Sequence, residues 1–228
     1  MNNENKKEVS SSESKLAASL EKNRIPLVCT FAVVLAALVV FTAVEVIGSK
    51  QTEKNLSKID SISFALTDSS EGLEDDELEA RRAEAISSLE PFVKKGGIAG
   101  VRANMLCAEI LYQQDKYSDA LVYWERTAAK GKKSYTAPIA YYNIGVCNEQ
   151  IGNLDAAADS YSKAAEADFV LASHAGFSYG RVLESQGKYD EAFAAYQELN
   201  DRNPDDTWAN IAKTRMIALQ SEGKVKSE

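Results

Sequence analysis

The longest apolar run of the chain lies near its N-terminus. Residues 25–47, IPLVCTFAVVLAALVVFTAVEVI, contain only Thr30, Thr42 and Glu45 as clearly polar positions. As a helix this run is roughly 35 Å long at about 1.5 Å per residue, which is enough to cross the hydrocarbon core of a bilayer. The pattern therefore predicts a single transmembrane helix at 25–47.

Other interpretations of this run fit less well. A buried helix of a soluble domain would need apolar segments around it, and no other segment is apolar enough. A cleaved signal peptide usually has a shorter apolar core that ends at a small-residue cleavage site, whereas this run is long and lacks a good site. A lipoprotein signal does not fit, because the apolar core follows Cys29 instead of preceding it.

Charged residues on either side of the run predict its orientation. Five basic residues precede it, and only Lys50, Lys54 and Lys58 follow closely. The positive-inside tendency then favours a cytoplasmic N-terminus and an exported body anchored in the inner (plasma) membrane. The chain carries a formal charge of −8, and its acidic body argues against binding to nucleic acid or to anionic lipid.

The flanking segments differ from one another in composition. Residues 1–24 are polar and predict a disordered cytoplasmic tail, because they cannot bury enough apolar surface to fold. Residues 48–76 predict a juxtamembrane helix, with Leu56, Ile59 and Ile62 at helical spacing, followed by an acidic loop. Residues 77–95 predict another helix, closed by two glycines.

Beyond residue 100 the chain repeats itself. Segments 102–128, 139–165 and 174–200 align, with small residues at Ala108, Gly145 and Gly180 and again at Ala120, Ala157 and Ala192. Aromatic residues recur at Trp124, Tyr161 and Tyr196. We interpret each segment as two antiparallel helices brought close by the small residues. Gly145 is expected opposite Ala157, Tyr161 fills the space beside that pair, and Ala164 lets the next unit approach.

This pattern resembles the tetratricopeptide repeat (TPR) over residues 101–204. The resemblance implies a TPR-type α-solenoid over 77–220. With the N-terminal transmembrane helix predicted from the apolar run, the expected fold is all-α. About three and a half units are expected, at 101–134, 138–171 and 173–206, with a capping helix at 207–220 and a loose tail at 221–228. The early large residue of the family is present at Tyr141 but replaced by Asn104 and Gly176 in the other units.

The resemblance also implies a partner-binding groove lined by the first helix of each unit. Mixed aromatic, apolar and charged lining suits an extended or helical protein segment. The groove residues carried over by position are Arg102, Met105, Glu109, Tyr112, Ile139, Tyr142, Val146, Glu149, His174, Phe177, Arg181 and Glu184.

No catalytic or cofactor-binding chemistry is indicated. The chain has one histidine, His174, and lacks phosphate-binding and nucleophile motifs. We expect no enzyme activity, no cofactor, no metal and no small-molecule substrate. Cys107 and Cys147 are expected to be buried free thiols, with a disulfide between them as the alternative.

The sequence thus predicts a non-catalytic, membrane-anchored scaffold that binds other proteins on the exported side. The arrangement of short tail, single span and repeat body is similar to the ancillary subunits of the bacterial Sec translocon. That resemblance implies protein partners among translocon subunits and periplasmic chaperones, and a role in export or envelope-protein folding. Two alternatives stay open: an adaptor of a division or outer-membrane assembly complex, and a cytosol-facing receptor.

Overall fold

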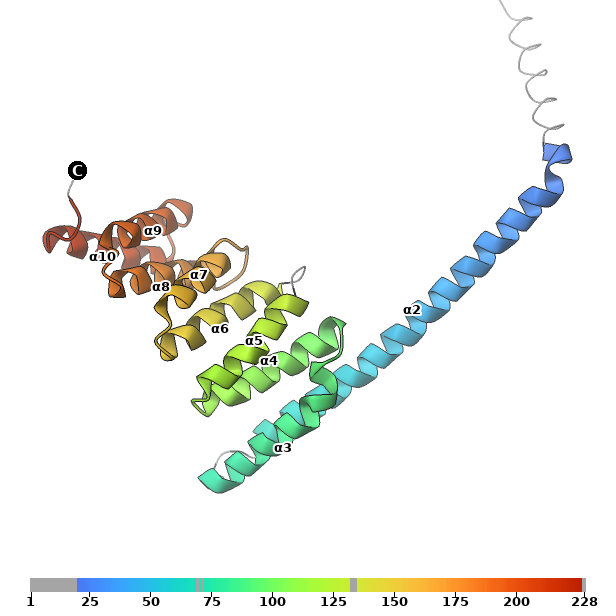
Figure 1. Ribbon diagram of the computed structural model, residues 1–228, viewed down its shortest axis with the longest axis horizontal. Coiled ribbons are helices and arrows are strands. Elements are labelled where there is room, and N and C mark those ends of the chain that lie inside the picture. The colour runs from blue at the N-terminus through green and yellow to red at the C-terminus, as the bar shows by residue number, and fades with distance from the viewer. Residues whose placement is uncertain (1–19, 69, 71, 132–134, 227–228) are drawn as a thin grey trace, which may run out of the picture. The chain divides into compact units, whose positions relative to one another are not determined.

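The computed structural model of the protein describes residues 20–68, 70, 72–131 and 135–226. All regular secondary structure in these ranges is helical, which confirms the all-α prediction (Figure 1). Most of the predicted cytoplasmic tail lies outside the described residues. The helices are α2 (Arg24–Thr67), α3 (Asp75–Val93), α4 (Gly97–Gln113), α5 (Tyr117–Lys130), α6 (Thr136–Gln150), α7 (Leu154–Ala165), α8 (Ala172–Ser185), α9 (Tyr189–Arg202) and α10 (Thr207–Ser221).

The chain divides into two compact units, Met1–Glu53 and Lys54–Glu228. Within the described part of the first unit, α2 exposes large apolar side chains such as Phe31 and Val40, at 67% and 62%. α2 is long and apolar enough to cross a membrane, and none of its most apolar 18-residue window is buried. The observation agrees with the predicted span by length and composition.

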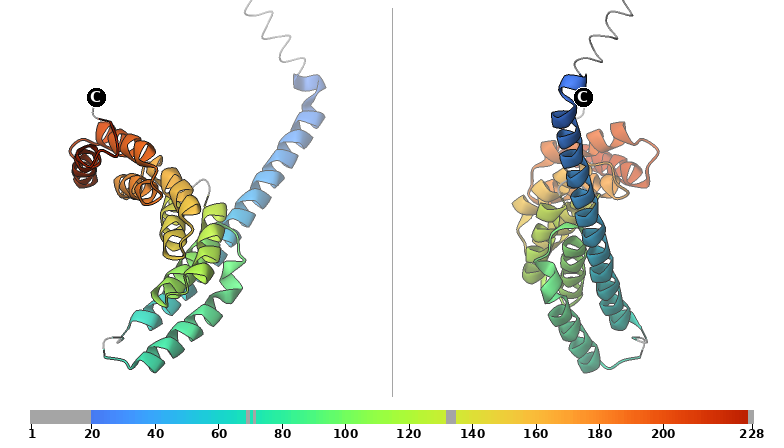
Figure 2. Two further views of the ribbon diagram at one scale, coloured as in Figure 1. Left: turned by 60° about the vertical axis from the view of Figure 1, so that its left-hand side comes forward. Right: turned by 90° about the vertical axis from the view of Figure 1, so that its right-hand side faces the viewer.

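The second unit begins with a hairpin that the sequence pattern does not reveal. Ile59, near the end of α2, is 1% exposed and packs in one cluster with Leu89 and Phe92 of α3. α3 runs back beside this last part of α2 and leads into α4 (Figure 2). The compact body therefore starts at Lys54, within the predicted juxtamembrane helix, rather than at residue 77.

Three further hairpins follow, α4–α5, α6–α7 and α8–α9, and their turns share one geometry. Asp115, Gly152 and Gly187 have positive φ angles of 57°, 77° and 75°. In each turn the next residue donates its backbone N–H to the carbonyl five residues earlier, as from Lys188 to Leu183 O at 3.0 Å. This capping bond ends the first helix and sends the chain back antiparallel.

The recurrent small residues lie under the recurrent aromatic rings. A Cβ on Gly145 would stand 2.7 Å from Cδ1 of Tyr161, and one on Gly180 would overlap the ring of Tyr196. Gly145 thus faces the Tyr161 ring directly, whereas the sequence suggested Ala157 as its opposite. All ten predicted packing residues are buried, Trp124 and Tyr161 to 2% exposure.

Tyr141 provides the early large residue of its unit, and the other two units have different residues at this position. Asn104 donates its amide Nδ2 to the carbonyls of Val93 and Gly100, at 2.9 and 2.6 Å, and so satisfies the end of α3. Gly176 leaves the position without a side chain and lines a cavity between α7, α8 and α9.

The segment after α10 is more ordered than the predicted loose tail, as far as residue 226. Gly223 has a φ of 68°, and the N–H of Lys224 donates to Leu219 O at 3.0 Å. Val225 packs against the cluster that contains Leu219, and the Lys224 ammonium lies 4.8 Å from the Tyr189 ring. These contacts fold the segment back onto the last hairpin.

Candidate functional site

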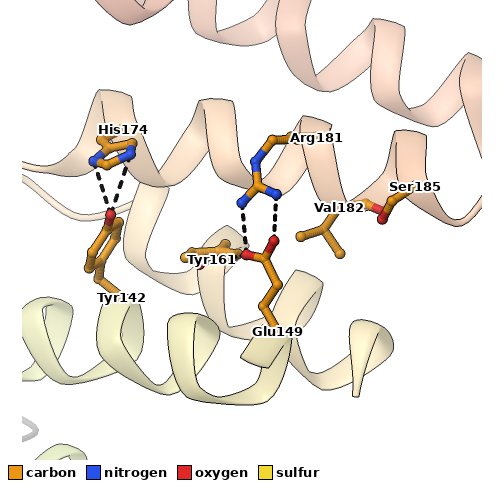
Figure 3. Close-up of polar contacts among 7 residues, drawn as sticks. All are labelled: Tyr142, Glu149, Tyr161, His174, Arg181, Val182 and Ser185. Carbon is orange, nitrogen blue, oxygen red and sulfur yellow. Dashed lines mark hydrogen bonds and ion pairs between the residues drawn. The ribbon is translucent and has the colours of Figure 1, made fainter. Parts of the chain in front are cut away.

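The candidate site is the inner surface, defined as the face formed by Tyr142, Glu149, His174, Phe177, Arg181 and Glu184 on α6 and α8. Its central contact joins two adjacent hairpins. The Arg181 guanidinium binds both carboxylate oxygens of Glu149, with Nη2 2.7 Å from Oε2 (Figure 3). The Tyr161 hydroxyl, from the second helix of the hairpin, donates to the same oxygen at 3.1 Å.

The electrostatics of this contact follow from its donors. The hydrogen bonds from Arg181 lower the pKa of Glu149 below its usual value, although partial burial opposes the shift. Burial and the nearby Glu149 carboxylate raise the pKa of Tyr161. At neutral pH the contact is therefore a charged pair with a neutral phenol donor.

The same arrangement recurs one unit later. The carboxylate of Glu184 accepts from the Tyr196 hydroxyl at 3.1 Å and from Arg215 Nε at 3.2 Å. Glu149 and Glu184 are 35 residues apart, and Arg181 and Arg215 are 34 apart. A Tyr–Glu–Arg contact thus links α6–α7 to α8, and α8–α9 to α10. Arg215 was not among the predicted groove residues.

An aromatic cluster forms the other side of the inner surface. The Tyr142 hydroxyl lies 3.0 Å from Nδ1 of His174, and the His174 ring stacks on Trp208 with centroids 3.8 Å apart and planes 5° from parallel. Phe177 contacts the same Trp208 ring at 5.3 Å. Burial, with a further contribution from Arg181, lowers the pKa of His174, so its ring is neutral at pH 7.

A cavity of about 350 Å³ lies at the α10 end of this surface. Phe177, Tyr189 and Tyr196 contribute aromatic walls, and Arg181, Arg215 and Lys224 contribute cationic groups. An opening with aromatic walls and paired charges can hold an apolar side chain while exchanging ion pairs with a bound chain.

The predicted groove residues of the first unit do not join this surface through the same contacts. Arg102 pairs with Asp60 of α2 at 2.7 Å, and Met105 and Tyr112 pack against the core of α4–α5. Glu109 lines a separate cavity of about 290 Å³, where burial raises the pKa of its carboxyl. Of the other predicted residues, Val146 packs against the core cluster around Tyr161 and Ile139 is half-buried.

The first unit also lacks the Tyr–Glu–Arg contact. Tyr112 occupies the place of the glutamate, Trp124 that of the tyrosine and Val146 that of the arginine. Trp124 Nε1 is buried without a hydrogen-bond partner among the described residues. Trp208 and Arg215 therefore extend the inner surface onto α10, whereas α4 makes no equivalent contact at these positions.

Trp208 and Arg215 are not among the predicted groove residues, because the sequence predicts residues 207–220 only as a capping helix. Trp208 follows His174 by 34 residues, the same interval that separates Arg215 from Arg181. Aligning α10 with the first helices of the repeats would have placed both residues on the inner surface.

The two body cysteines are free and buried. Burial raises the pKa of Cys107 to about 12 and that of Cys147 to about 11, so both thiols stay protonated at neutral pH. They lie in separate core clusters, one with Ile59 and the other with Trp124. Both side chains pack within the hydrophobic core.

Comparison with known proteins agrees with the repeat architecture. The family described as tetratricopeptide repeat matches residues 108–170 and 163–207. A TPR repeat-containing protein of Treponema pallidum (strain Nichols) is 32% identical over 130 residues, which are 57% of this chain and 54% of that protein. The chain therefore spans about half the length of this curated relative.

Two solved structures share the fold at low sequence identity. The crystal structure of MamA protein has a TM-score of 0.50 and 18% identity, covering 76% of this chain and 86% of that one. Rap protein complexed with Competence and Sporulation Factor has a TM-score of 0.50 and 20% identity, covering 75% of this chain and 48% of that one. With its repeated small and aromatic positions, its stacked hairpins and these matches, the chain carries tetratricopeptide repeats over residues 108–207.

Proposed function

We infer that the protein is a scaffold for protein–protein interaction, which is the function that tetratricopeptide repeats indicate. We propose that this protein is a non-catalytic scaffold anchored to a membrane by α2, and that its inner surface binds an extended or helical segment of a partner protein. The single observation that carries the proposal is the continuous surface from Tyr142 to Arg215, with aromatic rings, charged pairs and a cavity of about 350 Å³.

The chemistry of the surface suggests how the partner is held. The Phe177 and Tyr189 walls suit an apolar anchor, and Arg181, Arg215 and Lys224 can turn from their present acidic partners to a carboxylate of the incoming chain. Rap protein, which shares the fold, was solved in complex with Competence and Sporulation Factor. It supports the idea that such a solenoid holds another molecule, without naming the partner here.

The membrane placement rests on α2. Its apolar window is long enough to span a bilayer and is wholly exposed, which a core helix of a soluble domain would not be. The excess of basic residues before the span favours an exported body. We further propose a role in protein export or envelope-protein folding, with translocon or chaperone subunits as partners.

The test uses photo-crosslinking from exposed positions that leave the Tyr–Glu–Arg contacts intact. A photo-crosslinking residue replaces Ser185, which lines the cavity of about 350 Å³ beside Glu184, or the exposed Gln150, which follows Glu149 in sequence. Matched controls replace Asp159 of α7 or Glu125 of α5. We expect specific protein adducts from the first pair only. Equal adducts from all four positions, or none from the inner surface, would defeat the proposal.

Two observations distinguish the remaining functions: which proteins are crosslinked, and on which side of the membrane the body lies. Adducts with translocon or chaperone subunits support the export role, whereas division or outer-membrane assembly proteins point to the adaptor. A reporter fused after Glu228 that is active only in the cytosol would refute the exported orientation and favour a cytosol-facing receptor.

A further inference from the structure

A cavity of about 60 Å³ opens between α7, α8 and α9. Ala165, Gly176 and Leu199 line its apolar part, and Glu166, Glu198 and Arg202 lie at its polar edge. None of these residues belongs to the inner surface. The cavity is thus a separate feature of the third hairpin.

The repeat itself shows what fits such a place. In the preceding hairpin Tyr141 packs against the cluster that contains Ala128, and the Lys163 ammonium lies 5.8 Å from its ring. Gly176 follows Tyr141 by 35 residues, Glu198 follows Lys163 by 35, and Ala165 follows Ala128 by 37. The cavity of the third hairpin therefore lies at the repeat position that Tyr141 occupies in the second hairpin.

The backbone at Gly176 leaves this space open without strain. A Cβ at Gly176 would lie 3.6 Å from Leu199 Cδ1 and 3.7 Å from Ala165 Cβ, which are ordinary van der Waals contacts. Glycine is not needed there for close approach, in contrast to Gly180, whose Cβ would overlap the Tyr196 ring. The cavity is therefore present because residue 176 has no side chain, although the packing around it does not require glycine there.

We propose that this cavity binds an aromatic side chain, tyrosine in preference to phenylalanine, presented by a partner protein. Ala165 and Leu199 supply apolar contact for the ring, and the Arg202 guanidinium at the edge can stack on it. Arg202 is held there by bonds to Ala165 O at 2.7 Å and Glu198 Oε1 at 2.6 Å. The carboxylates of Glu166 and Glu198 can accept the phenol hydroxyl. This surface goes beyond the proposed function and does not depend on it.

The experiment titrates the full-length, detergent-solubilised protein with N-acetyl-L-tyrosinamide. The methyl NMR signals of Leu199 and Ala165 report on the cavity, and those of Leu111 and Ala120 in the first hairpin serve as reference. We expect saturable shifts of the cavity methyls only, at roughly millimolar concentration, as suits one ring in one small pocket. N-acetyl-L-phenylalaninamide should bind at least about twofold more weakly, and N-acetyl-L-alaninamide should produce no saturable shift.

Two variants fill the cavity from different walls. Gly176→Tyr adds to the cavity a ring like that of Tyr141 one unit earlier, and Ala195→Leu adds a larger apolar side chain from α9. Each variant should weaken the affinity for N-acetyl-L-tyrosinamide by at least about tenfold. Ala194→Tyr, at an exposed neighbouring position, is the control and should bind as the unaltered protein does. If Gly176→Tyr does not fold, Ala195→Leu decides alone.

Absence of saturable shifts in the unaltered protein, or unchanged affinity in the filled variants, would show that the cavity holds only solvent and overturn the proposal. Equal affinity for the tyrosine and phenylalanine amides would overturn the tyrosine preference. Because none of the variants changes the inner surface, failure here is distinguishable from failure of the crosslinking test.

Discussion

Gly176 and Gly180 lie about one turn apart in α8, yet their surroundings differ. Gly180 stands against the Tyr196 ring, so it cannot accept even one carbon without moving that ring, whereas Gly176 borders the open cavity. In a helix interior, alanine in place of an unconstrained glycine stabilises by roughly 1 kcal/mol. The repeat thus uses glycine for close approach at one position and leaves it replaceable at the other.

We predict opposite effects for two alanine substitutions in this helix. Gly176→Ala should raise the free energy of unfolding by about 1 kcal/mol, and Gly180→Ala should lower it by about 1–3 kcal/mol through overpacking against Tyr196. Urea unfolding followed by circular dichroism measures both. A destabilised Gly176→Ala protein, or a neutral Gly180→Ala protein, would contradict the packing described.

The pH dependence of stability should reveal the Glu149–Arg181 contact. The pKa of Glu149 is lowered in the folded protein from its ordinary 4.5, so its contribution is complete above that value and is lost as the pH falls toward the folded pKa. The difference in unfolding free energy between the unaltered protein and Glu149→Gln should shrink as the pH is reduced from about 6 to about 3.5. A difference that stays constant over this range would show that the ion pair contributes no stability.

At the scale of elements, α10 acts as the first helix of an incomplete further unit. It supplies Trp208 to the aromatic cluster and Arg215 to the second Tyr–Glu–Arg contact, although it has no second helix of its own among the described residues. Its start is fixed by Asp206, whose Oδ1 accepts the backbone N–H of Trp208 at 2.7 Å. Asp206, which caps α10, is therefore only two residues from Trp208, which belongs to the aromatic cluster.

We predict that removing this cap loosens α10 selectively. Asp206→Ala should cost about 1 kcal/mol and speed hydrogen exchange of the first amides of α10. Asp205→Ala, an exposed neighbour outside the cap, should leave exchange unchanged. Equal exchange in the two variants would mean that the stacking of Trp208 alone holds the helix start.

At the scale of the whole chain, the boundary of the folded body matters for any study of it. Leu56, Ile59 and Ile62 of α2 cover the core of α3 and α4, so a body cut at residue 77 would expose Leu89 and its neighbours. We expect residues 54–228 to unfold in one transition and residues 77–228 to be less stable by at least about 3 kcal/mol. Denaturant titration of the two fragments tests this, with Ile59→Ala in the longer fragment as an intermediate. Equal stability would place the boundary after α2.

Much of the architecture could be predicted from residues that recur at fixed intervals within each unit. The recurrence of Gly145 with Tyr161 and of Gly180 with Tyr196 defines the hairpins, because each glycine and ring belong to one unit. The hairpin of α2 with α3 could not be predicted in this way, since the part of α2 that contains Ile59 has no recognisable repeat pattern. Pairing of Arg181 with Glu149 also escaped prediction, because it depends on how successive hairpins are staggered.

The first unit has Tyr112, Trp124 and Val146 in place of a Tyr–Glu–Arg contact, and this difference has a mechanical consequence. From α6 onward, charged pairs cross-link neighbouring hairpins on one face, and such links resist shear between them. No equivalent pair joins α4 to α6 at these positions, and the first two aligned segments start 37 residues apart, against 35 for the next two. Bending of the superhelix should therefore concentrate at that seam, so that the C-terminal two and a half units swing as a stiff arm.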